Sequence, residues 1–253
     1  MMLHGASVLV TGGASGLGAA TATLLAKRGA KIAVLDLDEA KGRSIAESAG
    51  GIFCRCDVAD AASLEAAIAE AAAAHGAARI LVSCAGIGTA ARIVGREGPM
   101  PLAAFERVVR VNLIGTFNAM RLAAAAMTTL PPTETGERGV IVTTASVAAF
   151  EGQIGQAAYA ASKGGVVALT LPAARELARF GIRVLTIAPG LFRTPLVEEL
   201  PEETRASLSA AIPFPNRLGE PEEFAELVAA LVTNPYLNGE VIRLDGALRM
   251  APK

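Results

Sequence analysis

Short apolar runs alternate with longer alanine-rich segments along the whole chain. Several of these runs are apolar at nearly every position, as at residues 8–10 and 184–187. Strands of this kind are covered on both faces, and their alternation with helical segments is typical of consecutive β-α-β units. The expected strands are residues 7–11, 31–36, 51–56, 79–83, 139–145, 182–188 and 240–244. We therefore predict an α/β fold with a doubly wound, seven-stranded parallel sheet and helices on both faces.

Length and composition limit the class of protein. The 253 residues contain no Pro/Gly/Ser-rich linker and no abrupt change of composition, which predicts a single domain over residues 1–253. The formal net charge of -1 lacks the basic excess of a nucleic-acid surface, so we expect no nucleic-acid partner. The apolar runs are far shorter than the ~20 residues of a membrane-spanning helix, and residues 1–7 are too few for a signal peptide. We expect a cytoplasmic protein with no membrane partner.

The cysteines and histidines form no metal-binding pattern. Cys54, Cys56 and Cys84 have no metal-ligand spacing, and an odd count argues against a disulfide framework. His4 and His75 lie far apart in the chain with no matched carboxylates or thiols. We therefore predict free thiols and no metal.

Three segments interrupt the strand-helix alternation. Residues 88–101 and 131–138 are polar or glycine-containing connections that we expect at the surface. Residues 190–219 follow a strand and carry four prolines around one short helical stretch, which makes them a candidate substrate lid. An apolar slot beneath this lid could be lined by Phe192, Leu196, Leu200, Leu208 and Phe214. Some of these side chains could equally belong to the core or to a subunit contact.

A glycine-rich turn at residues 11–18 follows the first expected strand and opens the first expected helix. Glycine at 12, 16 and 18 lets the backbone turn sharply and approach a pyrophosphate at the helix N-terminus, where free N–H groups and the helix dipole favour anions. Alone, this turn is equally consistent with a tight connection that needs a small residue for packing. It indicates a dinucleotide site only together with further features.

Asp36 is such a feature, because it ends the second expected strand. There its carboxylate can accept hydrogen bonds from both ribose hydroxyls of an adenosine, which favours NAD. The 2′-phosphate of NADP would meet the carboxylate's charge, and Leu37 and Asp38 supply no arginine to offset it. The alternative is that Asp36 caps the following helix. Asp57 and Val58 end the third strand, where the aspartate can reach the adenine edge.

Ser146, Tyr159 and Lys163 indicate acid-base chemistry on a secondary alcohol. The i, i+4 spacing places the phenol and the ammonium on one face of a helix that begins near residue 157. A free phenol has a pKa of about 10. A lysine about 5 Å away, at an effective dielectric near 20, would stabilise the phenolate by about 3 kcal/mol. We expect Tyr159 to be the acid/base and Ser146 to hold the substrate oxygen, since no histidine is placed to make the serine a nucleophile. The alternative is an ordinary exposed helix pair.

The motifs resemble those of the short-chain dehydrogenase/reductase family over essentially the whole chain. In the family's order they are the turn at 11–18, Asp36, Asp57-Val58, residues 84–86, Val111-Asn112, Ser146, residues 159–163 (YAASK), and Pro189-Gly190 before Thr194. The resemblance implies a single-domain Rossmann fold, with Asn112 as the fourth catalytic residue, holding a helix backbone open for a water that links Lys163 to solvent. The implied cofactor contacts are Gly12, Ser15, Gly16, Leu17, Gly18, Asp36, Asp57, Val58, Cys84, Ala85, Gly86, Tyr159, Lys163, Pro189, Phe192 and Thr194. The implied substrate contacts are Ser146, Gln156, Tyr159 and Leu191.

Residues 144–153, 187–192 and 238–247 look like the type 2 3-hydroxyacyl-CoA dehydrogenase branch of this family. That resemblance implies oxidation of (S)-3-hydroxyacyl-CoA thioesters with NAD, in fatty acid metabolism, by a homotetramer. Ser83 departs from the family, which usually has asparagine there, and residues 90–100 and 131–138 match the branch poorly. A hydroxysteroid, 3-hydroxybutyrate or 3-oxoacyl-carrier enzyme therefore stays open. So do a non-catalytic dinucleotide-binding regulator and, as the least favoured reading, a methyltransferase.

Overall fold

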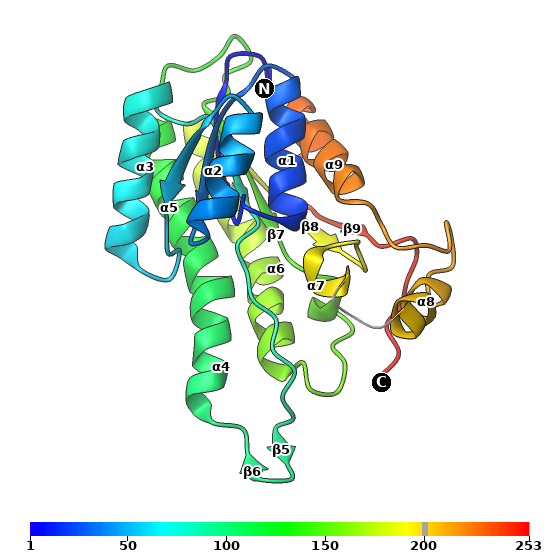
Figure 1. Ribbon diagram of the computed structural model, residues 1–253. Coiled ribbons are helices and arrows are strands. Elements are labelled where there is room, and N and C mark those ends of the chain that lie inside the picture. The colour runs from blue at the N-terminus through cyan, green and yellow to red at the C-terminus, as the bar shows by residue number, and fades with distance from the viewer. Residues whose placement is uncertain (199–201, 253) are drawn as a thin grey trace.

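A seven-stranded parallel sheet forms the centre of the protein (Figure 1). The computed structural model describes residues 1–198 and 202–252. The sheet has the order β3-β2-β1-β4-β7-β8-β9, and each neighbouring pair is parallel. Its strands are β1 (Ser7–Thr11), β2 (Lys31–Asp36), β3 (Ile52–Arg55), β4 (Ile80–Ser83), β7 (Gly139–Thr144), β8 (Ile182–Pro189) and β9 (Val241–Leu244). The predicted α/β fold and its seven strands are confirmed, with ends that agree or differ by one residue.

Helices cover both faces of the sheet. They are α1 (Gly16–Lys27), α2 (Glu39–Ser48), α3 (Ala61–His75), α4 (Leu102–Val109), α5 (Gly115–Thr128), α6 (Ala157–Leu177), α7 (Pro195–Glu198), α8 (Glu202–Ala210) and α9 (Pro221–Thr233). A π-helical turn, Arg110–Ile114, joins α4 to α5, and 3-10 turns lie at Val147–Ala149 and Ala178–Phe180. Parallel strands need such crossovers, which lead the chain back over a face of the sheet before the next strand.

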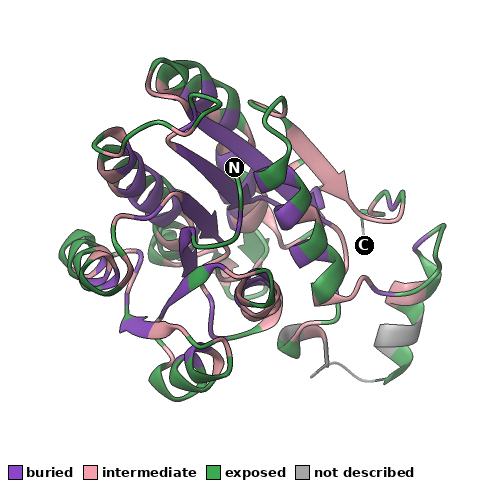
Figure 2. Cartoon of the chain, turned by 90° about the horizontal axis from the view of Figure 1, so that it is seen from above, coloured by how far each residue is buried: buried purple, intermediate pink, exposed green. Residues whose placement is uncertain are grey.

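Alternate residues of the central strands point into two separate apolar layers. Val8 and Val10 of β1 belong to the layer that contains α1 and α9, whereas Leu9 belongs to the layer that contains α3 and α5. All three of these β1 side chains are buried, as Figure 2 shows for the inner strands. The edge strand β9 is half-buried along its length. This two-sided burial explains why the inner strands are apolar at nearly every position.

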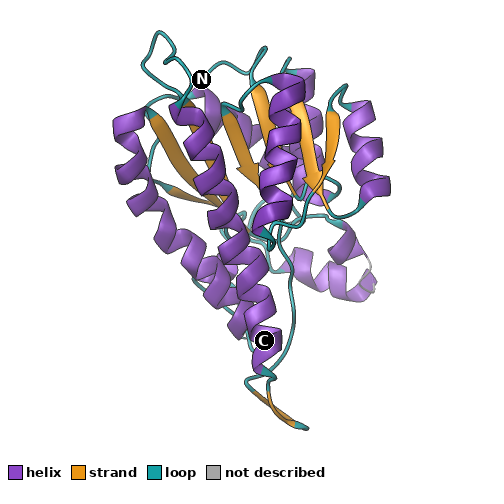
Figure 3. Ribbon diagram, turned by 90° about the vertical axis from the view of Figure 1, so that its left-hand side faces the viewer, coloured by secondary structure: helices purple, strands orange, loops and turns teal. Residues whose placement is uncertain are grey.

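Two of the interrupting segments differ from expectation. Within residues 88–101 the chain forms a short antiparallel hairpin of β5 (Val94–Gly95) and β6 (Gly98–Pro99), which was not predicted. Figure 3 shows this hairpin far from the sheet. The expected lid contains two helices, α7 and α8, rather than one. Among residues 1–198 and 202–252, no helix is both long and apolar enough to cross a membrane.

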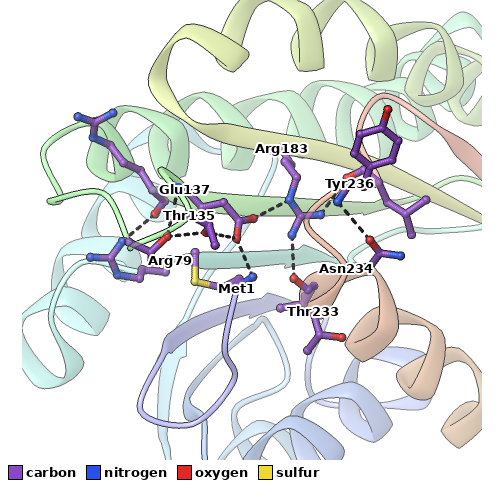
Figure 4. Close-up of polar contacts among 12 residues, drawn as sticks. Met1, Arg79, Thr135, Glu137, Arg183, Thr233, Asn234 and Tyr236 are labelled. Carbon is purple, nitrogen blue, oxygen red and sulfur yellow. Dashed lines mark hydrogen bonds and ion pairs between the residues drawn. The ribbon is translucent and has the colours of Figure 1, made fainter.

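Residues 131–138 were expected at the surface, but Glu137 is buried (Figure 4). Its carboxylate accepts hydrogen bonds of 2.7 Å from the Arg183 Nε and of 2.7 Å from the amino group of Met1. Arg183, also buried, donates three further hydrogen bonds to carbonyls in the last turn of α9 and just after it, those of Leu231, Val232 and Leu237. An inward-facing carboxylate is required here because a buried guanidinium without a counter-charge is costly.

The pKa of Glu137 reflects this pairing. Burial by itself raises the pKa of a carboxyl, but the hydrogen bonds from Met1 and Arg183 outweigh burial and hold the pKa of Glu137 below its ordinary value. The carboxylate is therefore charged in the folded protein at neutral pH, and it fastens the segment before β7 to the start of β8.

We expect Glu137→Gln to lower the free energy of unfolding by about 3 kcal/mol at neutral pH, because it leaves the buried Arg183 without its counter-charge. Urea denaturation measures the change. The control is Glu39→Gln, which removes an exposed ion pair with Arg43 and should cost less than about 1 kcal/mol. Equal, small losses in the two variants would show that the buried pair contributes no more than a surface pair.

Candidate active site

The carboxyl ends of β1, β4, β7 and β8 lie along one edge of the sheet, and the predicted site residues follow them. β1 pairs with β2 on one side and β4 on the other, so the chain leaves β1 and β4 toward opposite faces. Such a switch of direction opens a crevice at the carboxyl edge of a parallel sheet, which is where ligands bind in these folds. The topology therefore places the glycine turn and the predicted acid-base residues at one edge.

The glycine turn is held in shape by the chain's own packing. A Cβ on Gly12 (φ +67°) would lie 2.6 Å from the Ala85 backbone nitrogen, and one on Gly18 would lie 2.1 Å from the Gly12 carbonyl oxygen. Ser15 is the N-cap of α1, but its side chain accepts no capping hydrogen bond from the described residues. The first N–H groups of α1 are consequently available to an anion, so this end of the site fits the pyrophosphate of a dinucleotide.

Asp36 is oriented by two backbone amides. Its Oδ2 accepts from the Ala14 N–H and its Oδ1 from the Asp38 N–H, each at 3.0 Å. The alternative that Asp36 caps the next helix is wrong, because Asp38 is the N-cap of α2 and accepts from the Lys41 N–H. Each oxygen of Asp36 retains acceptor capacity, as a carboxylate that binds two ribose hydroxyls must.

Asp57 and Val58 follow β3 on the same side. The Asp57 carboxylate accepts a hydrogen bond from the Ala59 N–H at 2.9 Å, and the Asp57 backbone N–H donates to the Ser63 hydroxyl at 2.9 Å. Val58 is buried and packs so closely that a Cβ on Gly115 would lie 2.8 Å from its Cγ2. The Asp57 carboxylate thus keeps an oxygen that can accept a further hydrogen bond. The Val58 side chain packs in the core, so only its backbone could contact a ligand.

Residues 84–86 form the wall between the glycine turn and the predicted acid-base groups. The Thr144 hydroxyl donates to the Cys84 sulfur at 3.6 Å, and burial raises the pKa of that thiol to about 11. A Cβ on Gly86 would lie 3.2 Å from the Asn112 Oδ1 and 3.5 Å from the Lys163 Nζ. Glycine at 86 therefore lets this wall pass close to both polar side chains.

Ser83 stands where the family usually has asparagine, and it makes a smaller contact. Its hydroxyl accepts from the Thr11 hydroxyl at 3.3 Å, and the Thr11 oxygen accepts in turn from the Ala85 N–H at 3.4 Å. These two long hydrogen bonds tie β4 to β1 beneath the glycine turn. Thr11 thus links Ser83 to the backbone of the wall at 84–86.

Ser146, Tyr159 and Lys163 meet at the end of β7. Ser146 caps the 3-10 turn Val147–Ala149 by accepting from the Ala148 N–H at 3.1 Å. Tyr159 and Lys163 lie one turn apart on α6, and the Lys163 Nζ is 5.9 Å from the centroid of the Tyr159 ring. Lys163 is buried and donates to the Thr144 carbonyl at 2.7 Å. The reading as an ordinary exposed helix pair is therefore wrong.

Asn112 lies in the π-helical turn Arg110–Ile114, a distortion that recurs at functional sites. Its side chain accepts from the Ile87 N–H at 2.8 Å and donates to the Ile87 carbonyl at 2.9 Å. It also donates to the Ser162 hydroxyl, which donates to the Tyr159 carbonyl at 2.8 Å. A buried chain of hydrogen bonds thus joins Ile87, next to the wall at 84–86, to the turn of α6 that carries Tyr159.

We expected the Lys163 charge to lower the pKa of Tyr159, but in the protein alone the pKa of Tyr159 is raised. Burial raises the pKa of Tyr159, and the nearby Ser146 hydroxyl opposes this only in part. Burial also lowers the pKa of Lys163 to about 8. The lysine faces the phenol ring and the Thr144 carbonyl, so its charge does not hold the phenol acidic. Tyr159 is accordingly protonated at neutral pH in the protein alone.

The predicted substrate and lid residues are less well assembled. Phe192 is buried against Phe224 in an edge-on contact of 6.4 Å, so its side chain belongs to the core rather than to an apolar slot. Phe214 is 82% exposed, and Leu208 packs in a cluster with Ile212. Leu200 and the side chain of Leu196 lie outside the described residues.

The remaining predicted contacts lie around the crevice. Gln156 accepts from the Gln153 N–H at 3.0 Å, just before α6. Thr194 contacts the glycine turn, since a Cβ on Gly16 would lie 3.4 Å from its Cγ2. Leu191 lies two residues after Pro189, the last residue of β8, and packs within the lid against the cluster of Ile212 and Leu218. The side chain of Leu17 packs against the core layer of α1.

Two residues of the site were not identified from the sequence. Ser162 was detectable, because it lies three residues after Tyr159 on one helix face and is a polar residue within an apolar turn. Thr144 acts through its backbone carbonyl, for which a sequence carries no side-chain signal. Within residues 1–198 and 202–252, no three histidine, cysteine or acidic side chains are grouped closely enough to hold a metal ion.

Comparisons with known proteins agree with this geometry. The model of the short chain dehydrogenase family matches residues 6–205. The chain is 52% identical to 3-hydroxyacyl-CoA dehydrogenase type-2 of Drosophila melanogaster over 99% of its length and 100% of that protein. It is also 52% identical to the Homo sapiens protein of the same name, over 99% and 97% of the two chains. The crystal structure of 3-hydroxyacyl-CoA dehydrogenase type-2 from Mycobacterium avium is 49% identical, covers 98% of each chain and superposes with a TM-score of 0.95.

The buried Lys163 should impose a pH dependence on stability. Its pKa is about 8 in the folded protein and about 10.4 in an unfolded chain. Between these values the unfolded chain binds more protons, so the stability contributed by this group rises with pH. We expect the difference in free energy of unfolding, wild type minus Lys163→Met, to rise between about pH 8 and about pH 10.

Urea denaturation at several pH values measures this difference. The raised pKa values of Tyr159, Cys54 and Cys56 act in both proteins and cancel in the difference, which then reports Lys163 together with its interaction with Cys84. The control is Lys27→Met, which changes an exposed lysine and should keep the wild-type dependence. Parallel pH curves for the wild type and Lys163→Met would contradict the burial of a charged lysine.

Proposed function

This chain belongs to the short-chain dehydrogenase family, and from that premise we propose that it is an NAD-dependent oxidoreductase that interconverts (S)-3-hydroxyacyl-CoA and 3-oxoacyl-CoA thioesters. The observation that carries the proposal is the convergence of Ser146, Tyr159, Lys163 and Asn112 beside a glycine turn whose helix N-terminus is open to an anion. The 52% identity to proteins named 3-hydroxyacyl-CoA dehydrogenase type-2, over nearly the whole chain, supports the choice of substrate.

In the proposed oxidation, the Tyr159 oxygen removes the proton of the substrate's C3 hydroxyl. A bound oxidised nicotinamide would supply the hydride acceptor for C3 and a positive charge that would favour ionisation of the phenol. Ser146 donates a hydrogen bond to the substrate oxygen and keeps it within reach of the phenol. The protonated Tyr159 of the protein alone is the form that donates a proton to a ketone, so reduction begins from the resting state.

Lys163 and Asn112 complete the proposed proton path. The Lys163 ammonium is fastened to the Thr144 carbonyl, and its pKa of about 8 lies close enough to neutrality for it to exchange protons. Asn112 sits in the π-helical turn, where the irregular backbone spacing can admit a water next to Lys163. The proton released from the alcohol then passes from Tyr159 by way of Lys163 toward solvent.

The choice of NAD over NADP rests on Asp36. The Ala14 and Asp38 N–H groups donate to the Asp36 carboxylate and fix its orientation at the end of β2. A ribose hydroxyl pair would bind its two oxygens there. The 2′-phosphate of NADP would instead face a negative charge that Leu37 and Asp38 cannot neutralise. We propose NAD as the cofactor on this ground.

We further propose that the active protein is a homotetramer. Ile114 and Phe117 near the start of α5, each 49% exposed, lie beside Pro172 of α6 and line a shallow apolar depression with it. Exposed apolar surface of this kind on two adjacent helices suits a contact between identical chains. Sedimentation equilibrium tests the stoichiometry, and any mass other than that of four chains would contradict it.

The function is tested with a panel of 3-oxoacyl-CoA thioesters of rising chain length, monitored by NADH absorbance. We expect turnover of acetoacetyl-CoA by the wild type to exceed that of free acetoacetate and of a ketosteroid. Tyr159→Phe keeps the ring but removes the proton carrier, so its turnover should fall about 10²- to 10⁴-fold.

Each other outcome of the panel contradicts a defined part of the proposal. A preference for the ketosteroid or the free acid would replace the substrate class and keep the chemistry. Turnover by Tyr159→Phe within tenfold of the wild type would remove Tyr159 from its role. No turnover of any ketone would favour a dinucleotide-binding regulator.

Cofactor preference is tested with Asp36→Ala. Loss of the carboxylate should weaken NAD binding about tenfold and reduce the discrimination against NADP. Asp38→Ala is the matched control, because it removes the cap of α2 and should cost about 1 kcal/mol of stability while leaving the affinity for NAD unchanged. A wild-type enzyme that prefers NADPH would refute the charge argument.

A further inference from the structure

The loop at residues 150–156 connects Ser146 to Tyr159 and therefore borders the reacting centre. It is rich in glycine, with Gly152 and Gly155 (φ +91°), so its own backbone gives it little rigidity. A single main-chain hydrogen bond, from the Ala91 N–H to the Gly155 carbonyl at 2.9 Å, links it to the segment before the β5–β6 hairpin. Side-chain contacts and other segments of the chain must therefore hold this loop in position.

Arg243 of β9 is the centre of the contacts made by this loop. Its guanidinium donates to both oxygens of the Glu151 carboxylate, at 2.7 and 3.1 Å, and lies 5.3 Å from the centroid of the Phe150 ring. It also donates to the Asp245 carboxylate at 2.7 Å and to the Leu248 carbonyl at 2.9 Å. Arg243 thus joins the loop to the chain that follows β9, and the more exposed Arg249 lies 3.4 Å from the Glu151 carboxylate as a weaker second partner.

The C-terminal segment, residues 245–252, adds main-chain contacts to the same loop. The Met250 N–H donates to the Glu151 carboxylate, and the Ile154 N–H donates to the Pro252 carbonyl, each at 3.0 Å. The Gln153 side chain donates to the Ala251 carbonyl at 3.0 Å. Figure 1 shows the C-terminal end of the chain beside the lower end of α6, where this loop leads into the helix.

The opposite side of the C-terminal segment packs against the lid. Leu248 is 2% exposed and forms an apolar cluster with Ile212 and Leu218, against which Met250 also packs. Further members of this cluster are Leu191, Val197 and Leu208. The C-terminal segment therefore lies between the lid and the loop. Its contacts with the loop are polar, and its contacts with the lid are apolar.

We propose that the C-terminal segment is a common support for the two walls of the substrate site, and that Arg243, acting through Glu151, is the positioning residue that sets substrate affinity. Gln156 on the loop and Leu191 in the lid, both expected substrate contacts, are held through this support. The inference rests on the proposed function for its substrate, whereas the support itself is read directly from the contacts.

The geometry requires arginine at 243. Its planar fork binds the Glu151 carboxylate at two points and still has hydrogens for Asp245 and the Leu248 carbonyl, which a lysine ammonium cannot match in direction. The Arg243, Glu151 and Asp245 side chains are only 22%, 21% and 7% exposed, so solvent screens this network less than it screens a surface pair. Losing the fork frees the loop without touching Tyr159, Lys163 or the glycine turn.

The test is steady-state kinetics on Arg243→Met with acetoacetyl-CoA and NADH. We expect KM for the thioester to rise about tenfold while kcat stays within about threefold, because the loss is in binding of the substrate's body rather than in the chemical step. The affinity for NADH should be unchanged. Arg243→Lys, which keeps the charge but not the fork, should give an intermediate KM. Glu151→Gln should raise KM similarly, and the double variant Glu151→Gln/Arg243→Met should be no worse than either single one.

The matched control is Arg43→Met, which also removes an arginine that binds a carboxylate, that of Glu39, and lies over an aromatic ring, that of Phe53. It lies on α2, away from the lid and the loop, and its kinetic constants for the thioester should equal those of the wild type. Hydrogen exchange at the Ile154 amide gives a readout independent of substrate, and it should accelerate in Arg243→Met but not in Arg43→Met.

The outcomes separate the two proposals. A wild type that does not turn over the thioester overturns the proposed substrate, and the exchange rate at Ile154 then decides alone whether Arg243 holds the loop. A wild-type KM and unaccelerated exchange in a folded Arg243→Met protein overturn the role of Arg243. If Arg243→Met does not fold, Glu151→Gln and Arg243→Lys carry the test, and unchanged KM values in both overturn the inference.

Discussion

The pairing of β1 with both β2 and β4 is the constraint on which the rest of the structure depends. Because the sheet is parallel and buried on both faces, each connection must cross a face and return to the same starting edge. The carboxyl ends therefore gather along one edge, and the change of direction between β1 and β4 leaves that edge accessible. The glycine turn, the wall at 84–86 and the end of β7 meet there, although the turn and the end of β7 lie more than a hundred residues apart in the sequence.

Burial, rather than the attraction between Lys163 and Tyr159, dominates the electrostatics of the site. The lysine is fastened to a backbone carbonyl and carries a lowered pKa, while the phenol carries a raised one. Both shifts favour the uncharged forms of the two groups. Desolvation thus brings the pKa of Lys163 closer to neutrality and moves the pKa of Tyr159 away from it.

Two arginine networks hold the opposite ends of the sheet. At the amino edge, Arg183 and Glu137 are almost fully buried and fasten the start of β8 to the segment before β7 and to the end of α9. At the carboxyl edge, Arg243 and Glu151 are partly exposed and fasten the C-terminal segment to a loop beside the reacting centre. In each case the planar guanidinium binds a carboxylate and backbone carbonyls together, which a single apolar contact could not do. The first network stabilises the fold, and the second is proposed to position the substrate.

The sequence by itself determined the α/β sheet, the order of its elements and the identity of the polar residues at its carboxyl edge, because these follow from local periodicity and from spacing within one turn of helix. Only the tertiary structure decided that Asp38, not Asp36, caps α2, that Phe192 turns into the core, and that Glu137 is buried opposite Arg183. It also decided the sign of the Tyr159 pKa shift and the contact between the C-terminal segment and the loop at 150–156. Desolvation and contacts between residues far apart in the sequence depend on how the elements pack. The spacing of residues along the chain does not predict that packing.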